Sequence, residues 1–335
     1  MKPSVEKTLA RIKDTVESGA YYEAQQMYKT SYHRCKARQQ LDDAATILQE
    51  GAVTQLSHGQ ATCGVELGML LVEAYMSAGT PAESDSVGRV LAILRAFPPP
   101  DRTAADAGQE KAASSAAASA SVSSRGGVTA PVVDEYARLV ATAIKWASKS
   151  GAVLSARRIH SAFASYLWRS FGAEGIGRAL LHFVRGEDAE EFAEALHSCA
   201  QQGPPGEVDL WLLRAVLQVL SAATSHSRMA QLAHARALYD AFVARSPPLD
   251  TPTAHFTELV LLALEHVALS PRAHDMFVLA RERYSDGVLR RDDCLGPLLE
   301  RAEALYFNVR RGGGGMGGAL GGLLGDLFKT LTEAQ

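Results

Sequence analysis

The sequence lacks several features that would mark a secreted protein or a membrane protein. Its four cysteines are far apart and form no Cys-x-x-Cys pair: Cys35, Cys63, Cys199 and Cys294. This spacing argues against a disulfide framework and against a structural zinc site, and it favours reduced thiols. No apolar run approaches the roughly 20 residues that span a bilayer, and the N-terminus has no signal-peptide core. We therefore expect a soluble, cytosolic protein.

An excess of charge of either sign is also missing. The chain has 335 residues, with 34 Lys and Arg against 37 Asp and Glu, and a formal net charge of -3. Without a basic footprint, nucleic-acid binding has little support. Hydrophobic residues make up 47% of the sequence, which suffices for a sizeable core in one long domain or two ordinary ones.

Catalytic signatures are absent as well. The sequence has neither a Gly-x-Ser-x-Gly elbow nor a His-Glu-x-x-His pair. The glycine-rich stretch Gly312 to Gly318 is followed by no Gly-Lys-Ser/Thr, so it is not a phosphate loop. His33 with Cys35, and His197 with Cys199, are two residues apart, and such neighbours diverge by about 200° on a helix. We predict no catalytic, metal or cofactor site.

A helical enzyme, such as a prenyltransferase-like protein, remains as an alternative with little support. It would need clustered acids or metal ligands. The only Asp-Asp pairs are Asp42-Asp43 and Asp292-Asp293, and each is explained more simply as a helix-start or turn acid.

Helical periodicity runs through most of the chain, and alternating strand patterns are missing. Leu9, Ile12 and Val16 recur at helical spacing before Gly19, which predicts a helix that ends there. Further helices are expected over 21–37, 41–57, around 65–75, and over 83–97, 132–149, 155–170, 173–184, 188–201, 207–222, 228–245, 252–269, 271–285 and 293–309. Helices of about 15 residues joined by short turns are typical of stacked antiparallel hairpins. The fold class predicted is all-α, a tetratricopeptide-like α-solenoid with degenerate repeats, and the alternative is an irregular helical bundle.

Four segments follow from this pattern. Residues 1–100 and 131–311 form two sets of helical hairpins. Residues 101–130 are rich in Ala and Ser, cannot offset the entropy of ordering by burying surface, and are expected to form a flexible loop within the solenoid. Residues 312–335 combine a glycine tether with an amphipathic tail.

The tail carries one apolar stripe if it is helical, formed by Leu320, Leu323, Leu324, Leu327, Phe328 and Leu331. Three roles are open: docking to a partner, folding back onto the solenoid, or binding a membrane. Membrane binding is the weakest, because the polar positions Asp326, Lys329 and Glu333 form no basic face. Partner docking is slightly favoured over folding back.

A basic cluster at the end of the second expected helix has two explanations of similar weight. Its members are Lys29, His33, Arg34, Lys36 and Arg38. Cations at a helix C-terminus stabilise the helix dipole, which alone would account for them. The same side chains could instead dock an acidic partner surface.

Several blocks together resemble the Golgi-to-ER traffic protein four family. They are Val5-Glu6-Lys7-Thr8-Leu9, Gly19-Ala20-Tyr21-Tyr22-Glu23-Ala24-Gln25-Gln26-Met27-Tyr28, Gly51-Ala52, Ser57-His58-Gly59-Gln60, Ala143-Ile144-Lys145-Trp146-Ala147-Ser148, Glu207-Val208-Asp209, Arg214-Ala215-Val216-Leu217 and Gly321-Gly322-Leu323-Leu324-Gly325-Asp326-Leu327. The resemblance covers the chain except for 101–130.

The resemblance implies a non-enzymatic α-solenoid adaptor in the guided entry of tail-anchored membrane proteins to the ER. In that family the N-terminal helices dock a dimeric targeting ATPase, and the C-terminal half holds a partner with a ubiquitin-like domain. A chaperone passes the tail-anchored client through that partner, so the adaptor meets clients indirectly. Some lineages also bind a large ubiquitin-like chaperone scaffold. A generic tetratricopeptide-like scaffold of another complex is the alternative.

Carried onto this sequence, the ATPase-docking face comprises Arg34, Lys36 and Arg38, together with the acid Glu66, where relatives usually place Asp. Ala37 stands where some members of the family have a basic residue. The ubiquitin-like partner is expected around 207–222 and beyond, with its contact residues unknown.

Overall fold

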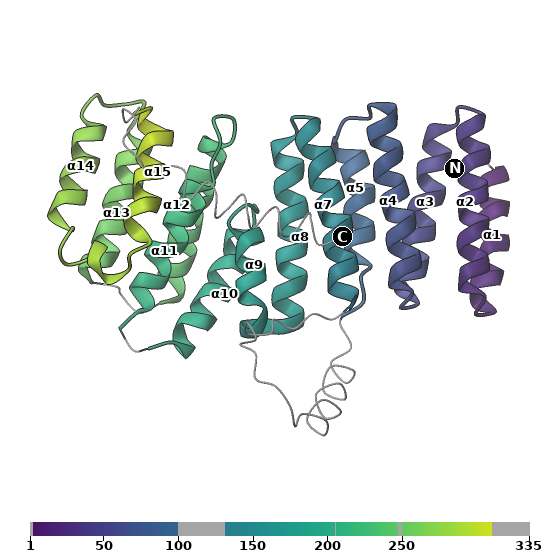
Figure 1. The fold of residues 1–335 in the computed structure, drawn as a ribbon, viewed down its shortest axis with the longest axis horizontal. Coiled ribbons are helices and arrows are strands. Elements are labelled where there is room, and N and C mark those ends of the chain that lie inside the picture. The colour runs from purple at the N-terminus through teal and green to yellow at the C-terminus, as the bar shows by residue number, and fades with distance from the viewer. Residues whose placement is uncertain (1–2, 100–130, 205, 247–249, 310–335) are drawn as a thin grey trace, which may run out of the picture.

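The computed structural model describes residues 3–99, 131–204, 206–246 and 250–309. Within these ranges the secondary structure consists of helices, without a strand. The helices stand side by side in one long row, with α1 at one end and α14 at the other (Figure 1). The segments predicted as a loop (101–130) and a tail (312–335) lie outside the described residues.

The helix bounds agree with the periodicity of the sequence to within a few residues at most ends. The helices of the first part are α1 (Pro3–Glu17), α2 (Tyr21–Ala37), α3 (Leu41–Ser57), α4 (Ala61–Ala78) and α5 (Ser84–Arg95). Those of the second part are α7 (Pro131–Lys149), α8 (Val153–Phe171), η1 (Gly172–Gly175), α9 (Ile176–Phe183), α10 (Ala189–Gln202), α11 (Val208–Ser221), α12 (Arg228–Arg245), α13 (Pro252–Glu265), α14 (Ala273–Arg283), η2 (Leu289–Arg291) and α15 (Leu295–Phe307).

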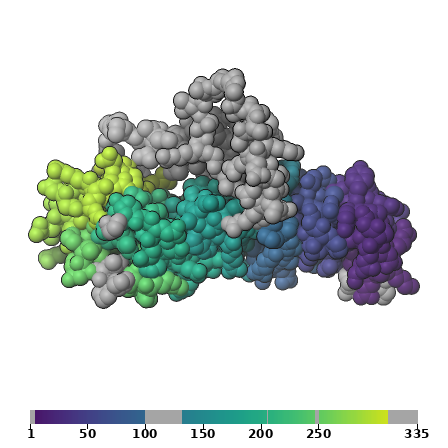
Figure 2. All heavy atoms as spheres, turned by 90° about the horizontal axis from the view of Figure 1, so that it is seen from below, coloured from purple at the N-terminus to yellow at the C-terminus, as the bar shows by residue number. Residues whose placement is uncertain are grey.

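Successive antiparallel helices stack into two layers at the N-terminal end. Helices α1, α3, α5 and α8 follow one another in one layer, and α2, α4 and α7 do so in the other. The space-filling view keeps the order of the chain along its long axis, from the first helices to the last (Figure 2). This arrangement is an α-solenoid, as the sequence predicted.

Glycine occupies the left-handed position at two sharp turns near the N-terminal end of the solenoid. Gly19, between α1 and α2, and Gly59, between α3 and α4, have φ angles of 81° and 74°. At both turns the next amide reaches back to close the helix end, from Ala20 to the Thr15 carbonyl and from Gln60 to the Gln55 carbonyl. A side chain would strain this left-handed backbone, so glycine makes the sharp reversal possible.

Gly51 has a different role, because it lets three helices approach closely. It lies within α3, and a Cβ built there would lie 2.8 Å from Cγ of Tyr28 on α2 and 3.0 Å from Cδ1 of Leu67 on α4. Both neighbours are buried. Any side chain at this position would therefore have to push a packed ring or leucine aside.

Polar and aromatic contacts of Trp146 join the helices before and after residues 100–130. Its ring stacks on Tyr75 of α4 with centroids 5.1 Å apart, and its Nε1 donates to the Thr80 carbonyl at 2.9 Å. Ser155 donates to the Ala82 carbonyl at 2.6 Å. The solenoid thus continues from α4 and α5 into α7 and α8. Trp168 and Trp211 also pack against the core and are only partly buried.

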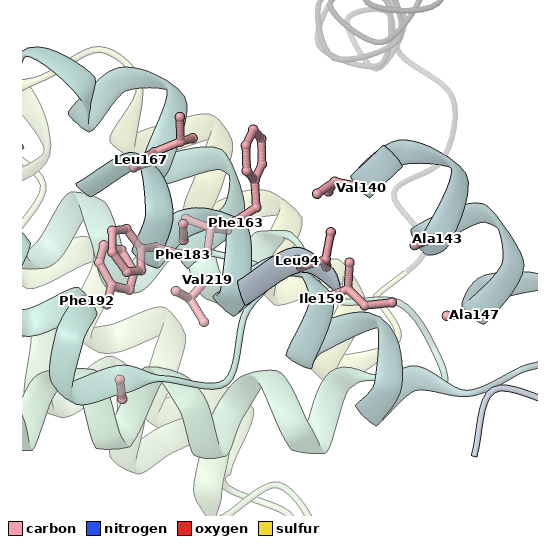
Figure 3. Packing of buried hydrophobic residues seen from close by; sticks show 14 of the residues in the cluster. Leu94, Val140, Ala143, Ala147, Ile159, Phe163, Leu167, Phe183, Phe192 and Val219 are labelled. Carbon is pink, nitrogen blue, oxygen red and sulfur yellow. The ribbon is translucent and has the colours of Figure 1, made fainter. Parts of the chain in front are cut away.

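The middle of the solenoid is held by apolar side chains from several helices. Figure 3 shows Phe183 of α9 facing Phe192 of α10, and their rings stack 5.1 Å apart and 5° from parallel. Leu94 of α5 and Ile159 of α8 lie side by side in the same view. Every one of these side chains is buried.

Three histidines, one of them fully buried, lie at the same joint. Nε2 of His234 on α12 is 3.0 Å from the Phe183 carbonyl, and Nδ1 of His160 on α8 is 3.0 Å from Nδ1 of His182 on α9. Burial lowers the pKa of His182 and of His234 to about 4 in each case. At neutral pH these histidines are therefore uncharged in the folded protein.

Two predicted helix boundaries were wrong, one at the end of α13 and one at the start of α9. The helix predicted over 252–269 ends at Glu265, and the chain leaves Val267 and Leu269 exposed in the turn before α14. The helix predicted from 173 begins as the short 3-10 turn η1, with α9 starting at Ile176. In both places periodicity continues past the point at which the backbone leaves the α-helix.

Replacing Gly51 with Ala should destabilise the fold by about 1–3 kcal/mol, because the added methyl overpacks against Tyr28 and Leu67. Gly88 is the matched control: it lies within α5 with open space around its Cα. There Ala should stabilise by about 0.5–1 kcal/mol through helix propensity alone. Urea unfolding of both variants measures the difference. Equal effects at the two sites would contradict the close approach at Gly51.

Acid should destabilise the protein between pH 6.5 and 4, because the unfolded histidines bind protons near pH 6.5 and the folded ones only near 4. Stability is therefore highest above this window and falls as the pH falls through it. Each of His182 and His234 should account for about 2 kcal/mol at pH 5 relative to pH 7.

The variant His234→Gln isolates one share of this effect, since Gln retains an N–H donor for the Phe183 carbonyl and does not titrate. Urea unfolding at pH 7 and pH 5 should show a smaller loss of stability in this variant than in the parent. An unchanged loss would mean that His234 does not contribute.

Candidate protein-docking surface

The basic residues predicted to dock a partner lie at the end of α2. Arg34 and Lys36 are in its last turn and Arg38 is its C-cap residue, whose amide donates to the Arg34 and Cys35 carbonyls at 3.3 and 3.1 Å. All three side chains are exposed. Their position suits the negative end of the helix dipole, so the local explanation of the cluster holds whether or not a partner binds.

These three cations do not form one continuous patch. At about 100° per residue, Arg34 and Arg38 lie about 40° apart around the helix, whereas Lys36 lies about 160° from each. The Arg34 flank also carries Met27, whose sulfur lies 3.6 Å from Oγ1 of Thr15 on α1. The Lys36 flank also carries Lys29 and turns toward α4. The cluster therefore splits into an α1 flank and an α4 flank.

Glu66 belongs to the α4 flank and is already paired there. Its Oε2 accepts from Nζ of Lys29 at 2.7 Å and from Nε2 of Gln25 at 2.8 Å, both on α2. The hydrogen bond from Lys29 is the main cause that lowers the pKa of Glu66, with a further contribution from the charge of Arg138 on α7. The carboxylate remains half exposed, at 49%.

The structure thus brings Glu66 together with Lys29 and places Lys36 on the same flank, while Arg34 and Arg38 point away from it. The pairing of Lys29 with Glu66 was missed from the sequence. The two residues are 37 positions apart, and only the stacking of α2 on α4 makes them neighbours. Lys36 instead lies over the ring of Tyr32, with Nζ 5.7 Å from its centroid.

In the second half of the chain, a buried acid ties four segments together. Both carboxylate oxygens of Asp209 accept from Nη1 of Arg291, at 3.1 and 3.0 Å, and one accepts from Oγ1 of Thr251 at 2.8 Å. Arg291 also donates to Thr253 and to the Gly206 carbonyl. Burial alone would raise the pKa of Asp209, but the hydrogen bonds from Arg291 and Thr251 lower it below its ordinary value.

Asp209 lies in the first turn of α11, where an acid also suits the helix dipole. In the structure it joins the start of α11 to η2 and to the start of α13. Next to it, Arg214 of α11 pairs with Asp292. Around 207–222, where a ubiquitin-like partner was expected, these charged side chains are therefore engaged within the chain.

Potential metal ligands are dispersed over the part of the chain that the structure describes. Within it, no group of three or more His, Cys, Asp and Glu side chains converges as metal ligands. His197, noted beside Cys199, has its ring edge-on to Phe242 and its Nδ1 3.3 Å from Oγ of Ser246. None of the described helices is long and apolar enough to cross a membrane.

The architecture defines a class: a helical-repeat solenoid that offers surfaces to other proteins. The crystal structure of C. therm. Get4 has the same fold, with a TM-score of 0.70 and 21% identity over 97% of this chain and 96% of that one. The model of the family Golgi to ER traffic protein 4 matches residues 38–328. The chain belongs to this family, which supports a role in the GET pathway of ER targeting.

Curated relatives agree with this assignment. The Arabidopsis thaliana protein named Protein GET4 is 28% identical over 317 residues, which cover 92% of each chain. The human Golgi to ER traffic protein 4 homolog is 25% identical over 306 residues, covering 91% of this chain and 81% of the relative. The resemblance inferred from the sequence blocks is confirmed.

Removing the Asp209 carboxylate should cost about 3 kcal/mol of unfolding free energy, because Asp209→Ala leaves the Arg291 guanidinium without its buried partner. Asp286→Ala is the matched control, since Asp286 pairs with the neighbouring Arg290 in a fully solvated ion pair and should cost less than about 0.5 kcal/mol. Chemical denaturation of the two variants measures both values. A cost for Asp209→Ala as small as that for the control would contradict the structural role of this network.

Proposed function

We propose that this protein is a non-enzymatic adaptor in the post-translational targeting of tail-anchored membrane proteins to the ER. It would act in the cytosol and bridge a targeting ATPase to a ubiquitin-like-domain partner that brings the chaperone-held client. A large ubiquitin-like chaperone scaffold is a further candidate partner. The observation that carries this proposal is the family match over residues 38–328.

The shape of the solenoid supports a bridging role. Its two ends are far apart along the row of helices, so two partners could bind without competing for one surface (Figure 1). Holding both partners raises their effective concentration for each other, a gain that needs no chemical step. We assign residues 1–100 to the ATPase and residues 131–311 to the ubiquitin-like partner.

The α2–α4 end is the proposed ATPase-docking face, with Arg34, Lys36, Arg38 and Glu66 as its candidate residues. Three of these side chains are exposed cations, and the described residues offer them no carboxylate partner within 4 Å. Such cations can steer and orient an acidic partner. Glu66 differs, because its pairing with Lys29 and Gln25 gives it a part in ordering the face rather than a free charge.

Charge reversal should separate the two flanks of this face. The double variant Arg34→Glu with Arg38→Glu tests the α1 flank, and Lys36→Glu tests the α4 flank. We expect the flank that contacts the ATPase to lose about tenfold in affinity at low ionic strength, with a smaller loss at high salt because ions screen exposed charges. Titration with the purified ATPase measures the affinities.

Arg283→Glu with Arg290→Glu is the matched control for the double variant, since both arginines are exposed at the opposite end of the solenoid. Unchanged affinity of both α2 variants at low salt would exclude this face. A pull-down distinguishes the adaptor from a generic tetratricopeptide-like scaffold, because only the adaptor should retain a ubiquitin-like protein.

A further inference from the structure

The two ends of the solenoid differ in what they expose. At the N-terminal end, the exposed side chains of α1 include Lys7, Arg11 and Asp14, and α1 carries no large exposed hydrophobic residue. Terminal repeats of solenoids need such a polar outer face, because no further repeat covers them. The outer side of α1 therefore has the polar character that a terminal repeat needs.

The C-terminal end of the described solenoid lacks such a polar outer face. Helix α14 is the last in the row and packs on α13 through Ala273, Phe277 and Ala280 (Figure 1). Its outer side and the turn before it expose four apolar residues, which we call the end patch: Val267, Leu269, Met276 and Leu279. Leu269 and Leu279 are 77% and 66% exposed. Of the eight large hydrophobic residues that are exposed among the described residues, half lie in this patch.

The chain leaves the described structure close to α14. The ring of Phe307, at the end of α15, lies 4.8 Å from that of His274 and 5.3 Å from that of Phe277, near the start of α14. His274 and Arg281 of α14 both bind Glu303 of α15, at 2.9 and 2.7 Å. The last described residue, Val309, therefore comes two residues after Phe307, which packs on the buried side of α14.

The sequence after Val309 complements the end patch. At helical spacing, Leu320, Leu324, Leu327, Phe328 and Leu331 form one apolar stripe, with Asp326, Lys329 and Glu333 on the opposite side. One side of this segment can cover an apolar surface while the other meets water. These are the properties of the polar cap that α14 lacks.

The tether is long enough to bring the stripe to the patch. Residues 310–319 connect Val309 to Leu320, and ten residues span up to about 33 Å when extended and about 17 Å on average when flexible. The path around a helix is shorter than the extended limit, since a helix with its side chains is about 10–12 Å wide. A short flexible linker also gives an effective concentration in the millimolar range, so a weak contact suffices.

We propose that the amphipathic tail, residues 320–331, folds back on its own chain and covers the end patch of α13–α14. The family match extends to residue 328 and so includes most of this stripe. The tail is favoured over a second copy or another protein because it is tethered close to α14, within reach of the patch, and carries a stripe of matching character. This inference does not depend on the proposed adaptor function.

Photo-crosslinking in the purified full-length chain tests the contact. A benzoylphenylalanine at position 327 should crosslink within the monomer to peptides spanning 266–283, with a yield independent of protein concentration. The double variant Met276→Asp with Leu279→Asp should reduce that yield at least fivefold. Both residues are exposed, so the fold should tolerate the change. Leu154→Asp, at an equally exposed leucine on α8, is the matched control and should leave the yield unchanged.

Hydrogen exchange gives a second measurement that alters no residue of the solenoid. Leu324→Asp with Leu327→Asp should speed exchange of amides in α14 about tenfold and leave that of α2 unchanged. Crosslinks that appear only in covalent dimers would assign the patch to a second copy and overturn the proposal. Crosslinks to other helices, or α14 exchange unaffected by the tail variant, would overturn it as well.

Discussion

A helical hairpin in this fold has apolar residues on both flanks and cannot cover them alone. Each hairpin therefore depends on a neighbour, and the solenoid exists because stacking satisfies this need repeatedly. Where the helices come closest, the constraint becomes specific: Gly51 allows α2, α3 and α4 to meet around Tyr28 and Leu67. Where the stack ends, the same constraint applies to α14, whose outer side has no described helix to cover it.

The fold was largely predictable because burial imposes a helical period on the sequence. The bounds of α2, α3 and α12 coincide with the expected ranges of 21–37, 41–57 and 228–245. Errors arose where the apolar periodicity of the sequence continues although the backbone has left the helix. Val267 and Leu269 continue the apolar pattern of α13 in sequence, but the backbone turns at Glu265 and leaves both side chains in solvent. Periodicity reports which residues are apolar, not whether a neighbour is present to cover them.

The candidate site was less predictable, because charged pairs depend on which helices become neighbours. The cations of α2 could be listed from the sequence, but their division into two flanks follows from helix geometry and from the position of α1 and α4. Likewise, the partner of Asp209 is Arg291, which is 82 residues away in the sequence. Such long-range pairs leave no local signal in a single sequence.

The two kinds of surface on this solenoid call for different explanations. Exposed cations at a helix end cost little to leave unpaired, because water solvates them and the helix dipole favours them. They can remain available until a partner arrives. Exposed apolar residues are different: the four of the end patch lie on α14 and in the turn before it, and burying them against any apolar surface lowers the free energy. A tethered segment with an apolar stripe covers such a surface more readily than a separate protein does. The tether gives it a high effective concentration, so it needs less intrinsic affinity than a free partner.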